Sequence, residues 1–109
     1  MSDGFEVAAI LIDIEAELRQ IGCWQAEVPP PSALRSEQPF AVDTLNFAQW
    51  LQFIFIPRMR FLIDQRQGLP RASGIAPMAE EYFSAKQLPV NGLMAALRAV
   101  DALLGSQQA

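Results

Sequence analysis

The sequence contains no histidine and a single cysteine among its 109 residues. Without histidine, Cys23 has no imidazole base to activate it as a nucleophile, and the Glu-x-x-His elements of di-iron helical bundles cannot be built. A lone cysteine also cannot form an internal disulfide, which favours a reducing compartment. We therefore interpret Cys23 as an ordinary buried or half-buried side chain, and we expect no metal and no cofactor.

Two kinds of membrane signal are also missing from the sequence. No apolar run is long enough to cross a bilayer, and the start, Met1-Ser-Asp-Gly-Phe-Glu, lacks the basic residues and apolar core of a signal peptide. These absences predict a cytoplasmic protein with no membrane partner.

Charged residues are scarce, at 18%, whereas hydrophobic residues make up 51% of the chain. This balance is far from that of disordered proteins, and it predicts a packed interior. A chain of this length supports one hydrophobic core. We therefore expect a single domain covering residues 1–109, either monomeric or in a simple oligomer.

The net charge of -4 is unevenly distributed. Residues 1–57 carry -6, and residues 58–109 carry +2. An acidic first half disfavours broad binding to a phosphate backbone. The later bases could still meet a small anionic patch, so RNA binding is retained as a less favoured alternative. The cluster in question consists of Arg58, Arg60, Arg66 and Arg71.

Apolar residues recur at helical spacing in four segments, and no alternating strand pattern competes with them. The predicted helices cover about residues 2–21, residues 43–67, a short segment from Pro77 onward, and residues 89–105. Asp3 and Glu6 resemble a capping box for the first helix. The sequence therefore predicts an all-α, single-domain four-helix bundle.

A long proline-rich loop is predicted between helices one and two, because Pro29-Pro30-Pro31 and Gln38-Pro39-Phe40 forbid a regular helix. Loops of this length tend to be functional or to be pinned by their own side chains. Trp24 and Phe40 are the expected pins. Within helix two, Pro57 predicts a bend or a division into two shorter helices.

Two charged residues fall on apolar faces of the predicted helices. At about 100° per residue, Arg58 lies in the middle of the apolar arc of helix two, and Asp101 lies between Leu97 and Leu104 on helix four. An unpaired charge there is costly, so we expect Arg58 and Asp101 to form a partly buried ion pair. Two alternatives are an arginine that reaches water and an arginine that binds a ligand anion in an inter-helix pocket.

Three neighbours of Pro57 complete the candidate binding or structural cluster. Trp50 lies at the edge of the apolar arc and is expected to pack in the core, whereas Phe53 lies in the polar arc and needs cover from the loop or from another molecule. Gln52 is expected to bond to loop backbone. The full cluster consists of Trp50, Gln52, Phe53, Pro57, Arg58 and Asp101.

Several strings in the sequence resemble the YqcC-like family, a domain of unknown function also called DUF446. They are Gln38-Pro39-Phe40, Asp43-Thr44, Trp50-Leu51-Gln52, Ile56-Pro57-Arg58-Met59, Leu69-Pro70 and Ala76-Pro77. The resemblance implies a bacterial four-helix bundle without an established reaction. Members often accompany a tRNA pseudouridine synthase gene, but this short helical chain does not resemble the α/β catalytic domain of that enzyme class.

These observations favour a non-enzymatic interaction or accessory module, with a link to tRNA modification. Its expected partner is an unidentified protein, contacted through the proline-rich loop and the region around Pro57. The alternative is a small-ligand binder with a pocket near Arg58. Self-association is left open by the sequence.

Overall fold

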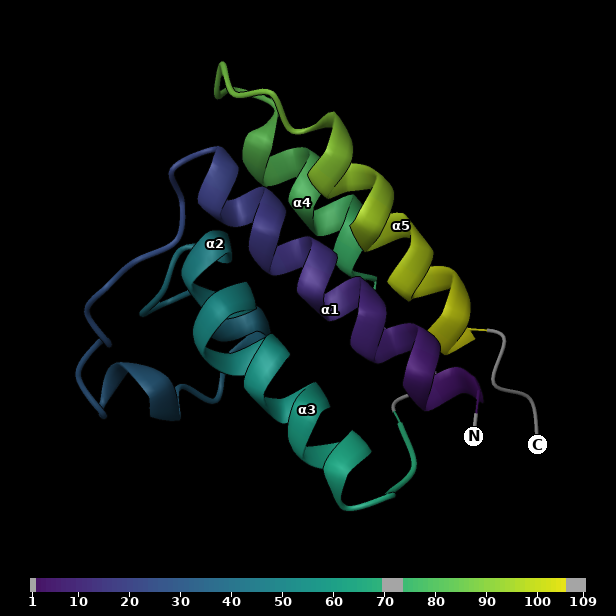
Figure 1. The fold of residues 1–109 in the computed structure, drawn as a ribbon. Coiled ribbons are helices and arrows are strands. Elements are labelled where there is room, and N and C mark those ends of the chain that lie inside the picture. Colours follow the sequence, from purple (N-terminus) through teal and green to yellow (C-terminus); the bar gives the residue numbers. More distant parts are fainter. Residues whose placement is uncertain (1, 70–73, 106–109) are drawn as a thin grey trace.

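The computed structural model describes residues 2–69 and 74–105, and over these residues the fold is all-helical (Figure 1). The α-helical and π-helical elements are α1 (Ser2–Gln20), α2 (Phe47–Trp50), the π-helical turn η3 (Leu51–Phe55), α3 (Ile56–Asp64), α4 (Ile75–Phe83) and α5 (Asn91–Gly105). Since α2, η3 and α3 are continuous, the described chain forms four helical rods. The predicted four-helix bundle is confirmed.

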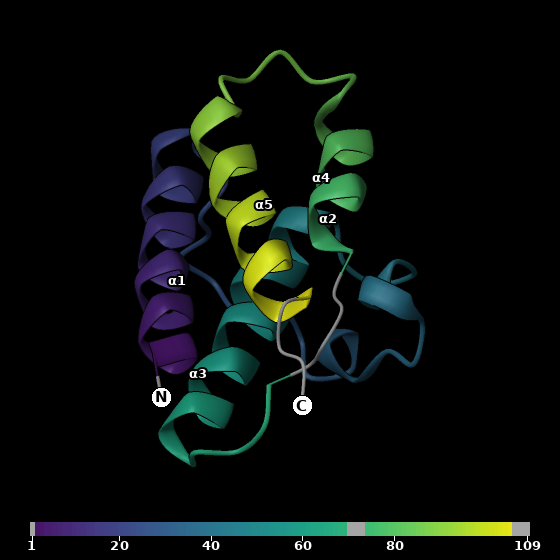
Figure 2. The ribbon, with the colours of Figure 1, turned by 90° about the vertical axis from the view of Figure 1, so that its right-hand side faces the viewer.

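The four rods surround one hydrophobic core. Helix α1 contacts α5 on one side and α3 on the other, α5 also contacts α4, and α4 contacts α2. Figure 2 shows α5 lying between α1 and α4, and Figure 1 shows α3 on the opposite side of α1 from α5. The central side chains of α1 and α5 are fully buried; they are Val7, Leu11, Ile14, Leu18, Leu93, Leu97, Val100 and Leu104.

Helix α1 ends as the sequence predicts, at a glycine in the left-handed region. Gly22 has a φ of 77°, its N–H donates to the carbonyl of Arg19 at 3.1 Å, and the N–H of Cys23 donates to Leu18 at 2.8 Å. This pair of bonds is a Schellman motif, which satisfies the last carbonyls of a helix. The predicted capping box at the other end involves the Asp3 side chain, which lies outside the described residues.

Helix α2 begins later than predicted. Its N-cap is Asn46 rather than Asp43 or Thr44: Asn46 Oδ1 accepts from the Gln49 N–H at 2.8 Å, and Gln49 Oε1 accepts from the Asn46 N–H at 2.8 Å. This reciprocal pair is a capping box. The prediction missed it because Asp43 and Thr44 are themselves good N-cap residues.

The interruption predicted at Pro57 takes the form of a π-helical turn. The N–H of Ile56 bonds to the carbonyl of Leu51, five residues earlier, and α3 then starts with Pro57 in its first turn. A proline inside a regular α-helix clashes with the carbonyl four residues before it. The wider π turn relieves this conflict while the backbone remains helical.

The proline-rich loop is pinned to the bundle, and it contains the short 3₁₀ segments η1 (Ala33–Arg35) and η2 (Pro39–Ala41). Thr44 Oγ1 donates to the carbonyl of Ala33 at 2.7 Å, and the Ser36 hydroxyl donates to Asp43. The predicted pins Trp24 and Phe40 are both half-buried against the core. The loop therefore has a defined shape.

Candidate interaction site

The predicted ion pair between Arg58 and Asp101 is wrong. Arg58 is exposed, and no ion pair among the described residues includes it. The Asp101 carboxylate instead accepts hydrogen bonds from the backbone N–H groups of Ile75, at 3.1 Å, and Ala76, at 2.7 Å. Asp101 therefore caps the start of α4 from a different helix, where the N-cap residue Gly74 has no side chain to do so.

The π turn explains why Arg58 was misplaced. One extra residue in a helical turn rotates everything after it by about 100° relative to a regular α-helix. The buried side chains of this rod accordingly recur every four residues, as Phe47, Leu51, Phe55 and Met59. Arg58 falls outside this buried set and is exposed.

Glu15 forms ion pairs with two arginine side chains. Its carboxylate lies 3.0 Å from the guanidinium of Arg19 and 3.3 Å from that of Arg60. The Arg19 pair lies within α1, whereas the Arg60 pair connects α1 to α3. Each is on the surface and stabilises the fold by only about 0.2–1 kcal/mol. On α3, Arg60 rather than Arg58 therefore forms an ion pair with another helix.

Gln52 bonds to loop backbone, as predicted. Its side chain is only 7% exposed; its Oε1 accepts from the Gln25 N–H at 2.9 Å, and its Nε2 donates to the Gln25 carbonyl at 2.8 Å. The amide thus satisfies both backbone groups of one loop residue, as an adjacent strand would. This pair attaches the first half of the loop to the π turn.

Replacing Gln52 with leucine should lower the free energy of unfolding by about 2 kcal/mol, because both backbone groups of Gln25 lose their partner in a partly buried place. The amide hydrogen of Gln25 should also exchange faster, which NMR would detect. Gln20→Leu, at an exposed position of α1, is the control and should change neither quantity appreciably. An unchanged exchange rate at Gln25 would contradict the role assigned to Gln52.

Trp50 belongs to an aromatic cluster that joins the loop to α2 and the π turn. Its ring lies 4.8 Å from that of Phe40 in an edge-on arrangement, and it stacks on Phe47 at 5.7 Å and on Phe55 at 5.4 Å. These are the geometries that aromatic pairs prefer. The predicted packing of Trp50 is confirmed.

The remaining members of the candidate cluster do not gather at one site. Phe53 is half-buried, and Pro57 and Arg58 face solvent. Asp101 is committed to the start of α4. The six residues therefore divide into two loop anchors, Trp50 and Gln52, the half-buried Phe53, an exposed part of α3 and a helix cap.

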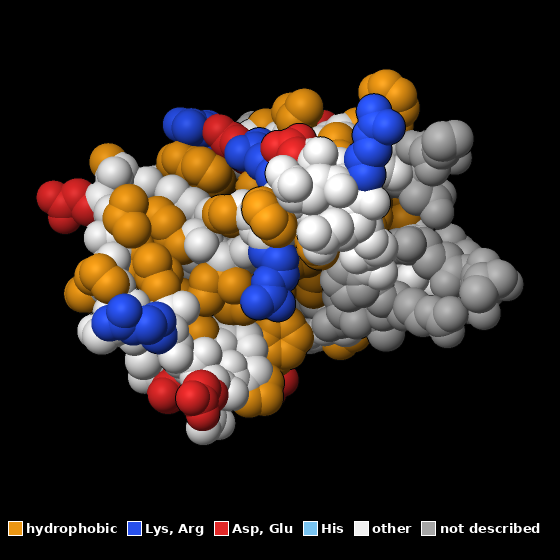
Figure 3. Space-filling view, turned by 90° about the horizontal axis from the view of Figure 1, so that it is seen from below, with side chains coloured by type: hydrophobic (Ala, Val, Ile, Leu, Met, Phe, Trp, Pro, Cys, Tyr) orange, Lys and Arg blue, Asp and Glu red, His pale blue; other side chains and the backbone are white. Residues whose placement is uncertain are grey.

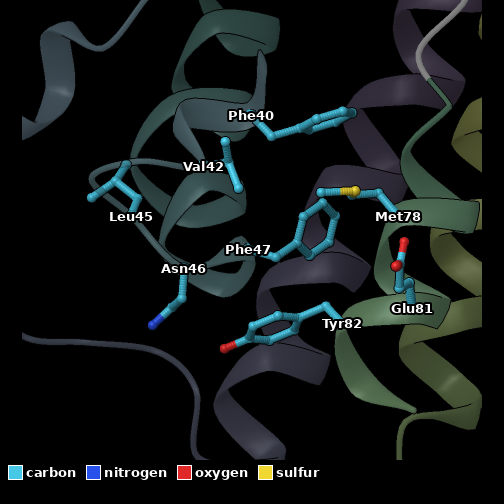
Figure 4. A pocket seen from close by; sticks show the side chains of 8 residues that line it. All are labelled: Phe40, Val42, Leu45, Asn46, Phe47, Met78, Glu81 and Tyr82. Atoms are coloured by element: carbon cyan, nitrogen blue, oxygen red, sulfur yellow. The ribbon is translucent and has the colours of Figure 1, made fainter. Parts of the chain in front are cut away.

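An open hollow that was not predicted from the sequence lies between the loop and α4, and we call it the aromatic hollow (Figure 4). Its volume is about 330 Å³. Two polar side chains, Asn46 and Glu81, line it, and the apolar lining consists of Phe40, Val42, Leu45, Phe47, Met78 and Tyr82. The sequence does contain one pattern that indicates an apolar surface here: Met78 and Tyr82 lie one turn apart on the same face of α4.

A second hollow, of about 320 Å³, lies between α1 and α5. It is lined by Asp13, Glu17, Gly92 and small or aliphatic residues of the two helices. Arg58 lines neither hollow. The predicted ligand pocket near Arg58 therefore has no support at that position.

Titratable groups near the aromatic hollow are poorly suited to nucleophilic chemistry. Burial raises the pKa of the Cys23 thiol, and the Lys86 charge opposes this shift. Burial also raises the pKa of Tyr82, with a further contribution from Cys23. Both side chains are therefore uncharged at neutral pH, and a thiol is a weak nucleophile in that form.

Basic side chains do not form a continuous stripe on the lower face of the molecule. Figure 3 shows Lys and Arg at separate places on this face, interspersed with acidic and hydrophobic side chains. Arg58, Arg60 and Arg66 are exposed, whereas Arg71 lies outside the described residues. Such a mixed surface differs from the basic footprint typical of nucleic-acid-binding domains.

No described helix combines the length and apolar character needed to cross a membrane. Within the same part of the chain, no three acidic or cysteine side chains are grouped so that they could hold a metal ion.

Comparison with known proteins places the chain among proteins that share both its sequence and its fold. It is 38% identical to the protein YqcC of Escherichia coli over 90 residues, which is 83% of each chain. The solution NMR structure of E. coli YqcC superposes with a TM-score of 0.84 at 36% identity and covers 100% of this chain and 93% of that one. An uncharacterised protein of Haemophilus influenzae is 38% identical over 71 residues, covering 65% of this chain and 67% of the relative.

One relative differs in length. A protein of Pectobacterium carotovorum named tRNA pseudouridine synthase C is 42% identical over 72 residues, which is 66% of this chain but 19% of that protein. The sequence model of the family DUF446, described as "tRNA pseudouridine synthase C", matches residues 6–103. The chain therefore belongs to the DUF446, or YqcC-like, family of bacterial proteins.

Proposed function

We propose that this protein is a non-catalytic accessory module that binds a tRNA pseudouridine synthase C. The observation that carries the proposal is the relative from Pectobacterium, in which the matching stretch makes up 19% of a protein with that name. The same module makes up most of E. coli YqcC, 83% of which matches this chain. When a module is joined to an enzyme in one organism and forms most of a short protein in another, direct contact with that enzyme is a natural explanation. The family description is consistent with the same partner.

The surface of the bundle supports an interaction role. Several large apolar side chains remain accessible outside the core, including Phe5 at 83%, Val42 at 60% and Phe61 at 57% exposure. Single exposed apolar residues are common, but the aromatic hollow adds a contiguous apolar surface beside Val42. A protein partner would gain free energy by covering it.

Charge supports a protein partner over the tRNA itself. The chain carries -4 overall, and the acid excess lies in residues 1–57, which include the loop and α2. A polyanion is repelled by such a surface, whereas an enzyme that holds tRNA presents basic groups that complement it. The module is therefore proposed to contact the enzyme.

The test is an equilibrium measurement between this purified chain and purified tRNA pseudouridine synthase C from the same organism. We expect a one-to-one complex with a dissociation constant of about 10 µM or tighter, measured by calorimetry and sedimentation. A pseudouridine synthase of a different family serves as the control and should not bind. Separate sedimentation of the two proteins at about 100 µM would refute the proposed function.

A further inference from the structure

We infer that the aromatic hollow is the docking site for the synthase, and that it receives an apolar side chain adjacent to a basic residue of that enzyme. This inference rests on the proposed function and adds the surface and the chemistry of the contact. The hollow lies between the second half of the loop, the start of α2 and one face of α4 (Figure 4). Its volume of about 330 Å³ is at the lower end of the range of natural binding pockets, which suits an anchoring side chain.

Most of the apolar lining is accessible, whereas Leu45 and Phe47 are only 7% and 4% exposed. Val42 is 60% exposed, and Phe40, Met78 and Tyr82 are half-buried. The centre of the buried Phe47 ring lies 6.0 Å from that of Phe40 and 6.0 Å from that of Tyr82, so contacts between aromatic rings connect the loop to α4. Aromatic and methionine side chains are the types that dominate the centres of protein interfaces.

The loop side of the hollow is held in an unusual backbone conformation. Phe40 and Ala41 have φ values of 56° and 51°, in the left-handed region that residues with a side chain rarely adopt. Two such residues in succession cost about 1–2 kcal/mol each. They persist because the Phe40 ring packs on Trp50 and the Leu45 N–H bonds to the Ala41 carbonyl at 2.9 Å. Strain of this kind is concentrated at functional surfaces, and here it keeps the hollow open before a partner arrives.

The polar lining selects the charge of the partner. Glu81 is an exposed carboxylate on α4, and the other polar lining residue, Asn46, is neutral. Lys86 lies with its ammonium 4.5 Å from the centre of the Tyr82 ring and is not part of the lining. A basic side chain of the partner would therefore find a carboxylate at the rim.

The Pectobacterium relative suggests why a small contact suffices. Where both modules lie in one chain, the effective concentration of one for the other is of the order of millimolar. A hollow that anchors a single side chain can then remain occupied. In separate chains, the same contact gives a weaker and reversible complex.

The experiment measures binding of the full chain to purified tRNA pseudouridine synthase C with two substitutions in the hollow. Val42→Asp places a charge in the apolar wall, and Glu81→Lys reverses the charge at the rim. Each should weaken binding about tenfold or more. Glu80→Lys is the matched control, since Glu80 is exposed and adjacent but does not line the hollow, and it should change the dissociation constant less than about twofold. All three positions are exposed, so the variants should keep the wild-type circular dichroism and urea midpoint.

NMR of labelled methionine methyl groups gives a second readout. Addition of the synthase should shift the Met78 methyl signal and leave that of Met59, which is 1% exposed in the core, unchanged.

Tight binding by the wild type with equal affinities for all variants would overturn the docking site while leaving the proposed function in place. Absence of wild-type binding would overturn both. Binding of free tRNA, or of a second copy of the chain, that is abolished by Val42→Asp would assign the hollow to a different occupant and refute the inference.

Discussion

Replacing Asp101 with alanine should lower the free energy of unfolding by about 3 kcal/mol. The carboxylate accepts from two backbone N–H groups at the start of α4, those of Ile75 and Ala76. Both residues are buried, so water cannot readily replace the lost acceptor. A hydrogen bond to a charged group contributes about 1.5–3 kcal/mol, and loss of a helix cap costs about 0.5–2 kcal/mol.

Urea unfolding would measure this loss as a lower midpoint at an unchanged slope. Asp101→Asn keeps one acceptor oxygen and should lose about half as much. Glu80→Ala, on the exposed side of α4, is the control and should cost less than about 0.5 kcal/mol. Glu15 is a poor control because it bonds to Arg19 and Arg60.

Arg58→Ala separates this interpretation from the ion pair predicted from the sequence. A buried pair would make loss of Arg58 as costly as loss of Asp101, about 3–5 kcal/mol. The exposed position of Arg58 instead predicts a change of less than about 0.5 kcal/mol. Equal losses for the two alanine variants would contradict the capping role of Asp101.

Replacing Leu11 with alanine should lower the free energy of unfolding by about 3–4 kcal/mol. Leu11 is 0% exposed in the middle of α1, the helix that contacts both α3 and α5. Truncation there removes apolar contacts on both sides and leaves a cavity that rigid helices can fill only partly, which is the range seen for buried leucines.

The next residue of the same helix supplies the control. Ile12 is 63% exposed, and Ile12→Ala should change the stability by less than about 0.5 kcal/mol, since alanine also favours the helix. Chemical unfolding of both variants is the measurement. Comparable midpoints would mean that the face of α1 assigned to the core is wrong.

The helices that could be predicted are those with regular spacing. In α1 and α5 the buried residues recur at intervals of three and four, and both helices follow the sequence pattern closely. From Phe47 to Met59, buried residues recur at intervals of four instead. A wheel of about 100° per residue does not fit that spacing, and it put Arg58 on the wrong side of the helix.

Single residues of the site could be predicted from the sequence, whereas the aromatic hollow could not. The buried amide of Gln52 and the loop pins Trp24 and Phe40 follow from side-chain chemistry at single positions. The aromatic hollow depends on the left-handed backbone at Phe40 and Ala41, which non-glycine residues rarely adopt and which no local pattern indicates. Its geometry is set by tertiary packing of the loop on Trp50.

The cap that Asp101 provides for α4 also bears on how the chain folds during synthesis. The carboxylate of Asp101 is 25 residues downstream of the Ala76 N–H that it satisfies. A growing polypeptide therefore exposes α4 before its cap has been made, and the helix gains that support only when α5 docks beside it. We therefore expect α4 and α5, which pack as an antiparallel hairpin, to gain stability together.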